Sequence, residues 1–127
     1  MQPMRLAFLA AALLAGDLCP GFAQSTTAFD GTWSGTGTLV ARRGRGTSCG
    51  PETTDRRFTI RNGRISFSYD RRYGIDFSGP IQPDGRFDLA SGPNRFFGQA
   101  SGSTLTATFS GRECERNFQF RRRRASR

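Results

Sequence analysis

The chain has 127 residues, a net charge of +9, 16 glycines and 12 phenylalanines, and it contains no histidine. At this length a single domain is the default. The absence of histidine removes the commonest general base and the commonest metal ligand from consideration. Hydrophobic residues make up only 35% of the sequence, so the phenylalanines must supply most of any core. The composition favours a small basic domain and disfavours catalysis.

The first 23 residues have the three-part pattern of a secretory signal peptide. Arg5 precedes an apolar run from Leu6 to Ala15, and the small residues Gly21 and Ala23 stand just before a cut after Ala23. The apolar run is about half of the ~20 residues needed to cross a bilayer. The sequence thus predicts a secreted or periplasmic protein with no transmembrane segment in its mature part.

Apolar and polar residues alternate along the rest of the chain, which is typical of half-buried β-strands. Turn signals separate the alternating segments, and Asn62-Gly63 is the strongest two-residue hairpin signal. The predicted strands lie, in chain order, within residues 32–40, 56–61, 64–69, 73–77, 87–89, 95–100, 104–110 and 114–120. The fold class predicted from this pattern is all-β.

Eight short strands with hairpin-length links predict an antiparallel up-and-down meander closed into a small barrel, with a two-sheet β-sandwich as the alternative. In such a barrel the first strand lies antiparallel to the eighth, so the end of the first meets the start of the last. Cys49 follows the first strand and Cys114 begins the last one. Their positions favour the barrel, with the domain over residues 24–120 and a basic tail over residues 121–127.

Cys49 and Cys114 are the two cysteines left after removal of the signal peptide. An oxidising compartment outside the cytoplasm favours a disulfide between them, and two free buried thiols are the alternative. A bridge that closes a loop of about 65 residues contributes roughly 4 kcal/mol on the chain-entropy account. For a domain of this size that is a large share of the total stability.

The same strand pairing places Trp33, near the start of the first strand, beside the late residues of the last strand. Arg122 is two residues after Phe120 and therefore shares the inward face of that strand with Phe118 and Phe120. Its guanidinium can thus lie on the indole ring. Gly31-Thr32-Trp33 resembles the Gly-x-Trp opening of the calycins, the lipocalin and avidin group. The resemblance implies a barrel over residues 29–122 with a structural role for Gly31, Trp33 and Arg122. It does not imply the avidin ligand, because that family lines its pocket with several tryptophans and this chain has one.

The sequence offers no catalytic machinery, and we expect no enzyme activity, no metal and no cofactor. It contains no Gly-x-Ser-x-Gly nucleophile motif, and both cysteines of the mature chain are expected to be joined. Asp76 and Asp88 lie in predicted strands, and paired carboxylates can serve hydrolysis. Both alternate with apolar neighbours, however, so we expect them to face water.

Arginine clusters are the main functional signal. All 19 basic residues are arginine, which we attribute to codon bias rather than to selection for the guanidinium group. The two main clusters lie in the long first loop and in the C-terminal tail, and their members are Arg42, Arg43, Arg45, Arg121, Arg123 and Arg124. Two further pairs, Arg56-Arg57 and Arg71-Arg72, lie elsewhere. We expect this surface to attract anionic envelope polymers or lipids, or an acidic protein. Nucleic acid is disfavoured as a partner of an exported chain. The alternative is that the charge maintains solubility and that the tail is a frayed end.

Gly35 and Gly37 share the inward parity of Trp33, which leaves two interpretations. They leave room for a small ligand, or they let the strand coil tightly around a core filled by phenylalanine, which is favoured. Three functions remain: a monomeric non-enzymatic domain that binds anionic envelope components, an inhibitor of a periplasmic hydrolase such as a protease, and a carrier of a small apolar ligand. The inhibitor hypothesis would use residues 24–28 as an inserting segment.

Overall fold

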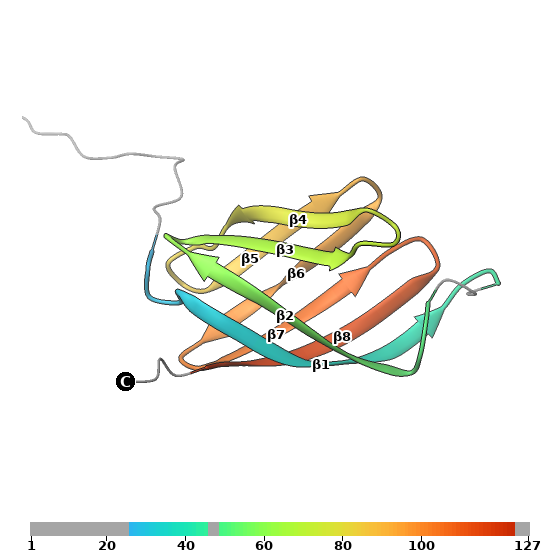
Figure 1. The fold of residues 1–127 in the computed structure, drawn as a ribbon, viewed down its shortest axis with the longest axis horizontal. Helices are drawn as coiled ribbons and strands as arrows, with labels where there is room; N and C mark the ends of the chain where they lie inside the picture. The colour runs from blue at the N-terminus through green and yellow to red at the C-terminus, as the bar shows by residue number, and fades with distance from the viewer. Residues whose placement is uncertain (1–25, 46–48, 124–127) are drawn as a thin grey trace, which may run out of the picture.

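Eight antiparallel strands form one sheet that curls into a nearly closed barrel (Figure 1). This computed structural model describes residues 26–45 and 49–123, so the predicted signal peptide and Arg124 lie outside the described residues. The strands are β1 (Gly31–Arg42), β2 (Thr53–Arg61), β3 (Arg64–Asp70), β4 (Ile75–Pro80), β5 (Arg86–Ser91), β6 (Asn94–Ser101), β7 (Thr104–Ser110) and β8 (Cys114–Arg122).

The predicted all-β meander is confirmed, and its eight strands belong to one sheet rather than to the two sheets of the sandwich alternative. Their order in the sheet is β4-β3-β2-β1-β8-β7-β6-β5, so β1 and β8 lie side by side at its centre. The ladder between β1 and β8 runs from Trp33 opposite Arg122 to Arg42 opposite Cys114. The strands β4 and β5 form the two edges of the sheet, and the barrel stays open between them.

The break between β4 and β5 has a local cause. Pro80, the last residue of β4, has no N–H to offer a neighbouring strand. The link after it turns toward the β2–β3 hairpin, where the Ile81 N–H donates to the Gly63 carbonyl at 3.0 Å. A Cβ added to Gly79 would lie 2.6 Å from Cδ2 of Leu89, so side chains fill the space between the two edges. These strands therefore meet through side-chain packing.

Of the strand ends that differ from the sequence predictions, three concern residues to which the sequence assigned another place. β1 continues through Arg42, which the sequence placed in a loop. β8 continues through Arg121 and Arg122, which the sequence placed in the tail. Pairing between β1 and β8 accounts for both extensions, because the ladder resumes at Ala41 opposite Glu115 after a register shift between Leu39 and Ala41. β4 begins after Tyr73, which is 54% exposed in a turn that ends at Gly74 with a φ of 65°, so Tyr73 does not join the inward face.

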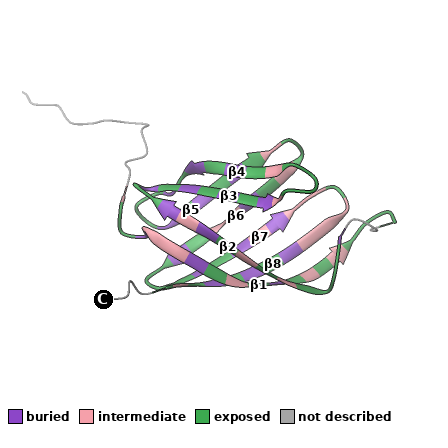
Figure 2. Cartoon of the chain, in the orientation of Figure 1, coloured by how far each residue is buried: buried purple, intermediate pink, exposed green. Residues whose placement is uncertain are grey.

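Inward-facing side chains form one aromatic core, which Figure 2 shows as alternating buried and exposed residues along the strands. The Phe96 ring lies at its centre. Its centroid is 5.0 to 6.3 Å from the ring centroids of Phe58, Phe67, Phe77, Phe87, Phe118 and Phe120. Burial of each such side chain stabilises the fold by about 1.5–3 kcal/mol. The phenylalanines thus supply the core, as the composition required.

Trp33 is buried at the end of the barrel where β1 begins. Its indole N–H donates to the Phe29 carbonyl at 2.9 Å. The Arg122 guanidinium lies over the indole, 5.3 Å from the ring centroid, and donates to the Ala28 carbonyl at 2.8 Å. A Cβ on Gly31 would lie 3.0 Å from the Arg122 side chain, and the φ of 142° at Gly31 favours glycine as well. The structure thus places these residues as the sequence led us to expect.

The interior beside Gly35 and Gly37 is filled. Gly37 lies opposite Phe118 in the β1–β8 ladder, and a Cβ added to Gly37 would lie 2.3 Å from the Phe118 ring. A Cβ added to Gly35 would lie 1.9 Å from the Gln119 carbonyl oxygen. Both glycines therefore let β1 coil closely against β8. This agrees with the filled-core interpretation and leaves no ligand space at these two positions.

We predict that Gly37→Ala lowers the free energy of unfolding by about 1–3 kcal/mol, because the new methyl group overpacks the core against Phe118. Urea unfolding followed by the fluorescence of Trp33 measures the loss. Phe118→Leu in the same chain makes room for the methyl group, so the double variant should lose less than the sum of the two single losses. Purely additive losses would contradict this contact.

Candidate functional site

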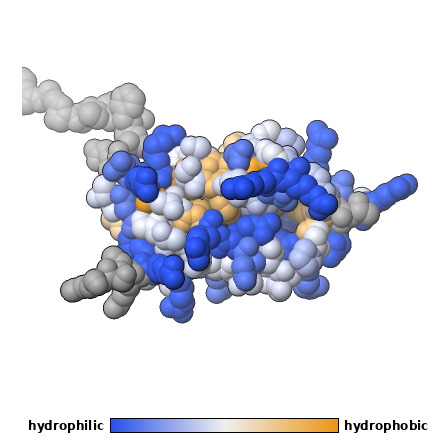
Figure 3. All heavy atoms as spheres, in the orientation of Figure 1, coloured by the Kyte–Doolittle hydropathy of each residue, from blue (hydrophilic) through white to orange (hydrophobic). Residues whose placement is uncertain are grey.

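The two predicted arginine clusters lie at opposite ends of the barrel. β1 and β8 run antiparallel, with Trp33 opposite Arg122 and Arg42 opposite Cys114. The strand from Trp33 to Arg42 spans about 30 Å at roughly 3.3 Å per residue. Hydrophilic side chains accordingly project from both ends of the molecule (Figure 3). The clusters do not form one compact site, and each end has to be considered alone.

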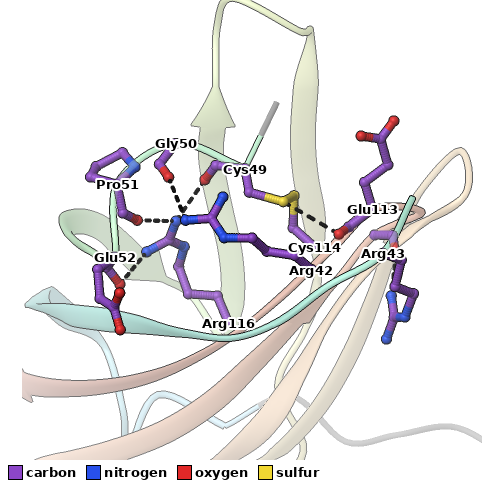
Figure 4. The surroundings of a disulfide bond; sticks show 10 residues. Arg42, Arg43, Cys49, Gly50, Pro51, Glu52, Glu113, Cys114 and Arg116 are labelled. Atoms are coloured by element: carbon purple, nitrogen blue, oxygen red, sulfur yellow. Dashed lines mark hydrogen bonds between the residues drawn. A yellow bond between two sulfur atoms is a disulfide. The ribbon is translucent and has the colours of Figure 1, made fainter. Parts of the chain in front are cut away.

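Cys49 and Cys114 form the predicted disulfide, with an S–S distance of 2.02 Å, at the end of the barrel where β8 begins (Figure 4). Arg116 on β8 is buried there, with 3% of its surface exposed. Its guanidinium donates to the carbonyls of Cys49 at 2.7 Å, Pro51 at 2.8 Å and Glu52 at 3.1 Å. Hydrogen bonds from a charged donor are strong. Arg116 and the disulfide therefore together hold residues 49–52 against the barrel.

Two of the three arginines predicted to bind anions at the disulfide end are held by the protein itself. Arg43 donates to the Glu115 carboxylate at 2.9 Å. Arg42 donates to the Gly50 carbonyl at 3.4 Å. Arg45 is exposed and lies next to residues outside the described part of the chain. Carboxylates and arginines are therefore mixed at this end, and the local charge is partly offset.

The opposite end carries a denser set of arginines. In the paired strands, Arg57 of β2 and Arg121 of β8 lie on either side of Ser34 of β1. Neighbouring strands are about 4.8 Å apart, so the two arginine Cα atoms are roughly 10 Å apart. Arg61 and Arg64 lie opposite each other at the β2–β3 turn of the same end. We call this set the cationic end, and its members are Arg57, Arg61, Arg64, Arg121 and Arg123.

The arginines of the cationic end are exposed, and none makes a side-chain hydrogen bond or ion pair with another described residue. Two carboxylates of the strands nearby are engaged elsewhere. Asp30 accepts from the N–H groups of Asn62 and Gly63 at 2.8 and 3.0 Å. Asp55 accepts from the Thr36 hydroxyl at 2.8 Å. The guanidinium groups are therefore available to a partner, and together they produce a local excess of positive charge.

Sequence reasoning found only part of the cationic end. The predicted residues Arg121 and Arg123 belong to it, whereas Arg124 lies outside the described residues. Arg57 was noted only as part of the Arg56-Arg57 pair, and Arg61 and Arg64 were missed, because these residues are far from β8 along the chain and approach it only through strand pairing. The sequence held one signal for them, the Asn62-Gly63 turn, because a two-residue turn places Arg61 and Arg64 opposite each other.

A broad groove lies on the outer face of the sheet, next to the cationic end. It was not predicted from the sequence. It encloses about 1260 Å³ over β1, β8, β7 and β6. Hydroxyl and amide side chains dominate its polar lining, and we call it the hydroxyl groove. Its uncharged polar members are Ser34, Thr36, Thr38, Thr104, Thr106, Thr108, Asn117 and Gln119. The sequence held a signal for it, since threonine fills the first three outward positions of β7.

A smaller hollow of about 220 Å³ lies at the disulfide end. Tyr69 and Phe109 line it as stacked rings with centroids 4.2 Å apart, and the exposed Tyr73 lines it as well. Burial raises the pKa of the Tyr69 phenol above its ordinary value, because the phenolate would lose its water, and the nearby charges of Arg56 and Arg116 oppose this effect. Tyr69 therefore keeps its proton more tightly in the folded protein.

Asp76 and Asp88, the acids considered for hydrolysis, are both exposed as expected. Asp88 forms an ion pair with Arg95 at 2.7 Å. Over residues 26–45 and 49–123, no group of three or more histidine, cysteine, aspartate or glutamate side chains could hold a metal ion. Within the same ranges, no helix is long and apolar enough to cross a membrane.

We predict that alkaline pH destabilises the fold partly through Tyr69. The folded state binds this proton more tightly than the unfolded chain does, so the stabilisation is complete below the ordinary tyrosine pKa of about 10 and is lost as pH rises above it. Urea unfolding at about pH 8 and at about pH 11 measures how far the free energy of unfolding falls between the two pH values. We expect this fall to be larger for the natural chain than for Tyr69→Phe. Equal falls in the two proteins would refute this role.

Compared with known proteins, the chain matches no family model, and it is significantly similar to no curated protein and to no solved structure. The eight-stranded barrel is compatible with the resemblance to calycins that Gly31-Thr32-Trp33 indicates. Function has to be argued from the surfaces of this chain alone.

Proposed function

We propose that this domain is a non-enzymatic protein of the periplasm or the cell exterior that binds anionic polymers of the cell envelope through its cationic end. One observation carries the proposal. The pairing of β2, β1 and β8 sets Arg57 and Arg121 on either side of Ser34, both exposed and without an acidic partner among the described residues. The Cys49–Cys114 disulfide supports an oxidising compartment.

The layout of the cationic end suits an extended anion better than a compact one. Outward residues recur about every 6.6 Å along a strand and about every 4.8 Å between strands, so the guanidinium groups spread over a surface. Each guanidinium can bind a carboxylate or phosphate with two parallel hydrogen bonds. A single exposed ion pair contributes only about 0–1 kcal/mol, so useful affinity needs several contacts at once. A polymer with repeated anionic groups supplies them on one molecule.

The other two functions considered from the sequence have less support. A carrier of an apolar ligand needs space inside the barrel, and the Phe118 ring occupies the space beside Gly37. An inhibitor that inserts its N-terminal segment would use residues 24–28, and Ala28 is held against the barrel, since its carbonyl accepts a hydrogen bond from the Arg122 guanidinium at 2.8 Å. Residues 24 and 25 lie outside the described residues. The exposed arginines therefore favour anion binding over both.

Immobilised heparin and poly-L-glutamate test the proposal, because both are polyanions. We predict that the mature domain is retained on both and that salt elutes it, since screening weakens contacts between exposed charges. Arg57→Ser combined with Arg121→Ser should weaken heparin binding about tenfold at low salt, the effect of two lost ion pairs. Elution salt and titration calorimetry measure the change.

The matched control removes the same charge from the opposite end, with Arg71→Ser combined with Arg112→Ser. Both residues are exposed, and neither side chain makes a hydrogen bond or ion pair with another residue that the structure describes. The control should bind heparin nearly as well as the natural chain. Equal losses in the two double variants would show that net charge alone matters and would defeat the assignment to the cationic end. Retention that does not respond to salt would defeat the proposal.

A further inference from the structure

The hydroxyl groove is built from three rows of residues that lie opposite one another across β1, β8 and β7. The rows, starting at the cationic end, are Ser34–Arg121–Thr104, Thr36–Gln119–Thr106 and Thr38–Asn117–Thr108. All but one of these nine side chains are uncharged hydroxyls or amides. Strands lie about 4.8 Å apart and outward residues recur about every 6.6 Å along each strand, so the rows form a regular lattice of polar groups.

We propose that the hydroxyl groove binds the sugar chain of an acidic oligosaccharide. This inference rests on the proposed function and specifies the chemical class of the polymer. Hydroxyl and amide side chains both donate and accept hydrogen bonds, and the hydroxyls of a sugar ring do the same. The apolar residues of the lining include Leu105, Ala107, Phe118 and Phe120, whose side chains are buried in the core, so few apolar side chains remain for the acyl chain of a lipid. The lining also offers few charges to a polyanion that lacks hydroxyls.

Several groove side chains are available to a ligand. Ser34, Thr38, Thr106 and Gln119 make no side-chain hydrogen bond with another described residue. Thr106 and Gln119 lie opposite each other in the middle row, so the two available groups adjoin at the centre of the groove. Two members of the third row are held by each other instead, since the Thr108 hydroxyl donates to the Asn117 amide oxygen at 3.1 Å.

The floor of the groove depends on two glycines beside the middle row. A Cβ added to Gly98 would lie 2.0 Å from the Thr106 carbonyl oxygen, and one added to Gly35 would lie 1.9 Å from the Gln119 carbonyl oxygen. Both glycines also line the groove. They allow β1 and β6 to coil closely against the two strands between them. Both glycines have the inward parity of their strands, so they bring the backbones close together beneath the outward side chains of the middle row.

Charge at one edge of the groove indicates that the sugar is acidic. Arg121 belongs to the first row, between Ser34 and Thr104, and it is also a member of the cationic end. Arg57 lies on the other side of Ser34. A sugar chain that lies along the groove and extends past Ser34 thus brings its carboxylates to this pair of arginines. The wall farthest from β1 includes Phe97, and the Arg95 guanidinium lies over its ring, 4.6 Å from the ring centroid.

The experiment compares two polyanions that carry the same acidic group on different backbones. Oligogalacturonate carries its carboxylates on sugar rings, and poly-L-glutamate of matched carboxylate number carries them on a polypeptide. Titration calorimetry of the mature domain at one low salt concentration gives both affinities. We expect oligogalacturonate to bind about tenfold more tightly, because only its ring hydroxyls can use the groove.

The variant removes the central hydrogen-bonding groups without altering charge, with Thr106→Val combined with Gln119→Leu. Both positions are exposed, and valine retains the β-branched shape of threonine, so the fold should be preserved. We expect this variant to bind oligogalacturonate about tenfold more weakly and poly-L-glutamate as before. Ser66→Val combined with Ser68→Val, on the outer face of β3 away from the groove, is the matched control and should change neither affinity.

The outcomes separate this inference from the proposed function. Equal affinity for the two polymers, with no effect of Thr106→Val and Gln119→Leu, would overturn the sugar-binding groove and leave anion binding intact. Failure to bind either polymer, or heparin, would overturn both. If Thr106→Val combined with Gln119→Leu lowers the affinity for both polymers equally, the groove binds carboxylates of any kind. That result would overturn the assignment to sugar. Circular dichroism and the urea midpoint confirm that each variant is folded.

Discussion

The pairing of β1 with β8 is the constraint on which the rest of the structure depends. It joins the first and last strands from Trp33 opposite Arg122 to Arg42 opposite Cys114. The two ends of this ladder are secured by different means, the disulfide at one end and the stacking of Arg122 on Trp33 at the other. A slip of one residue would turn every inward side chain of one strand outward. Because the register is fixed, the outward residues that share a row are fixed with it.

Arginine serves two separate purposes in this chain. The two purposes are distinguished by whether the side chain faces the inside or the outside of the barrel. The inward Arg116 and Arg122 donate to backbone carbonyls near the two ends of β8. A buried charge is costly unless hydrogen bonds satisfy it, and several charge-assisted bonds to carbonyls provide that satisfaction. The outward arginines of the cationic end have no such internal partners among the described residues. The net charge of +9 therefore overstates what is available for binding and says nothing about where it lies.

The sequence predicted those features that depend on local periodicity or on the topology of a meander. Alternation identified the strands, and antiparallel closure brought Cys49 to Cys114 and Arg122 to Trp33. The break between β4 and β5 was not predicted, because it depends on how the link after Pro80 packs against the neighbouring hairpin. The site was predicted least well. Arg57 and Arg121 approach each other only because both β2 and β8 pair with β1, and no spacing along the chain reveals that relation.

The cationic end and the hydroxyl groove differ in the range over which they act and in what they discriminate. Exposed charges attract at distances up to a Debye length of about 8 Å at physiological salt, and they attract any polyanion. Hydroxyls and amides act only on contact, and they depend on where the donors and acceptors of the ligand lie. The row that contains Ser34 and Arg121 belongs to both surfaces, so a ligand that uses both must carry charge and hydroxyls on one chain. Few polymers meet both requirements, and an acidic polysaccharide is the simplest that does.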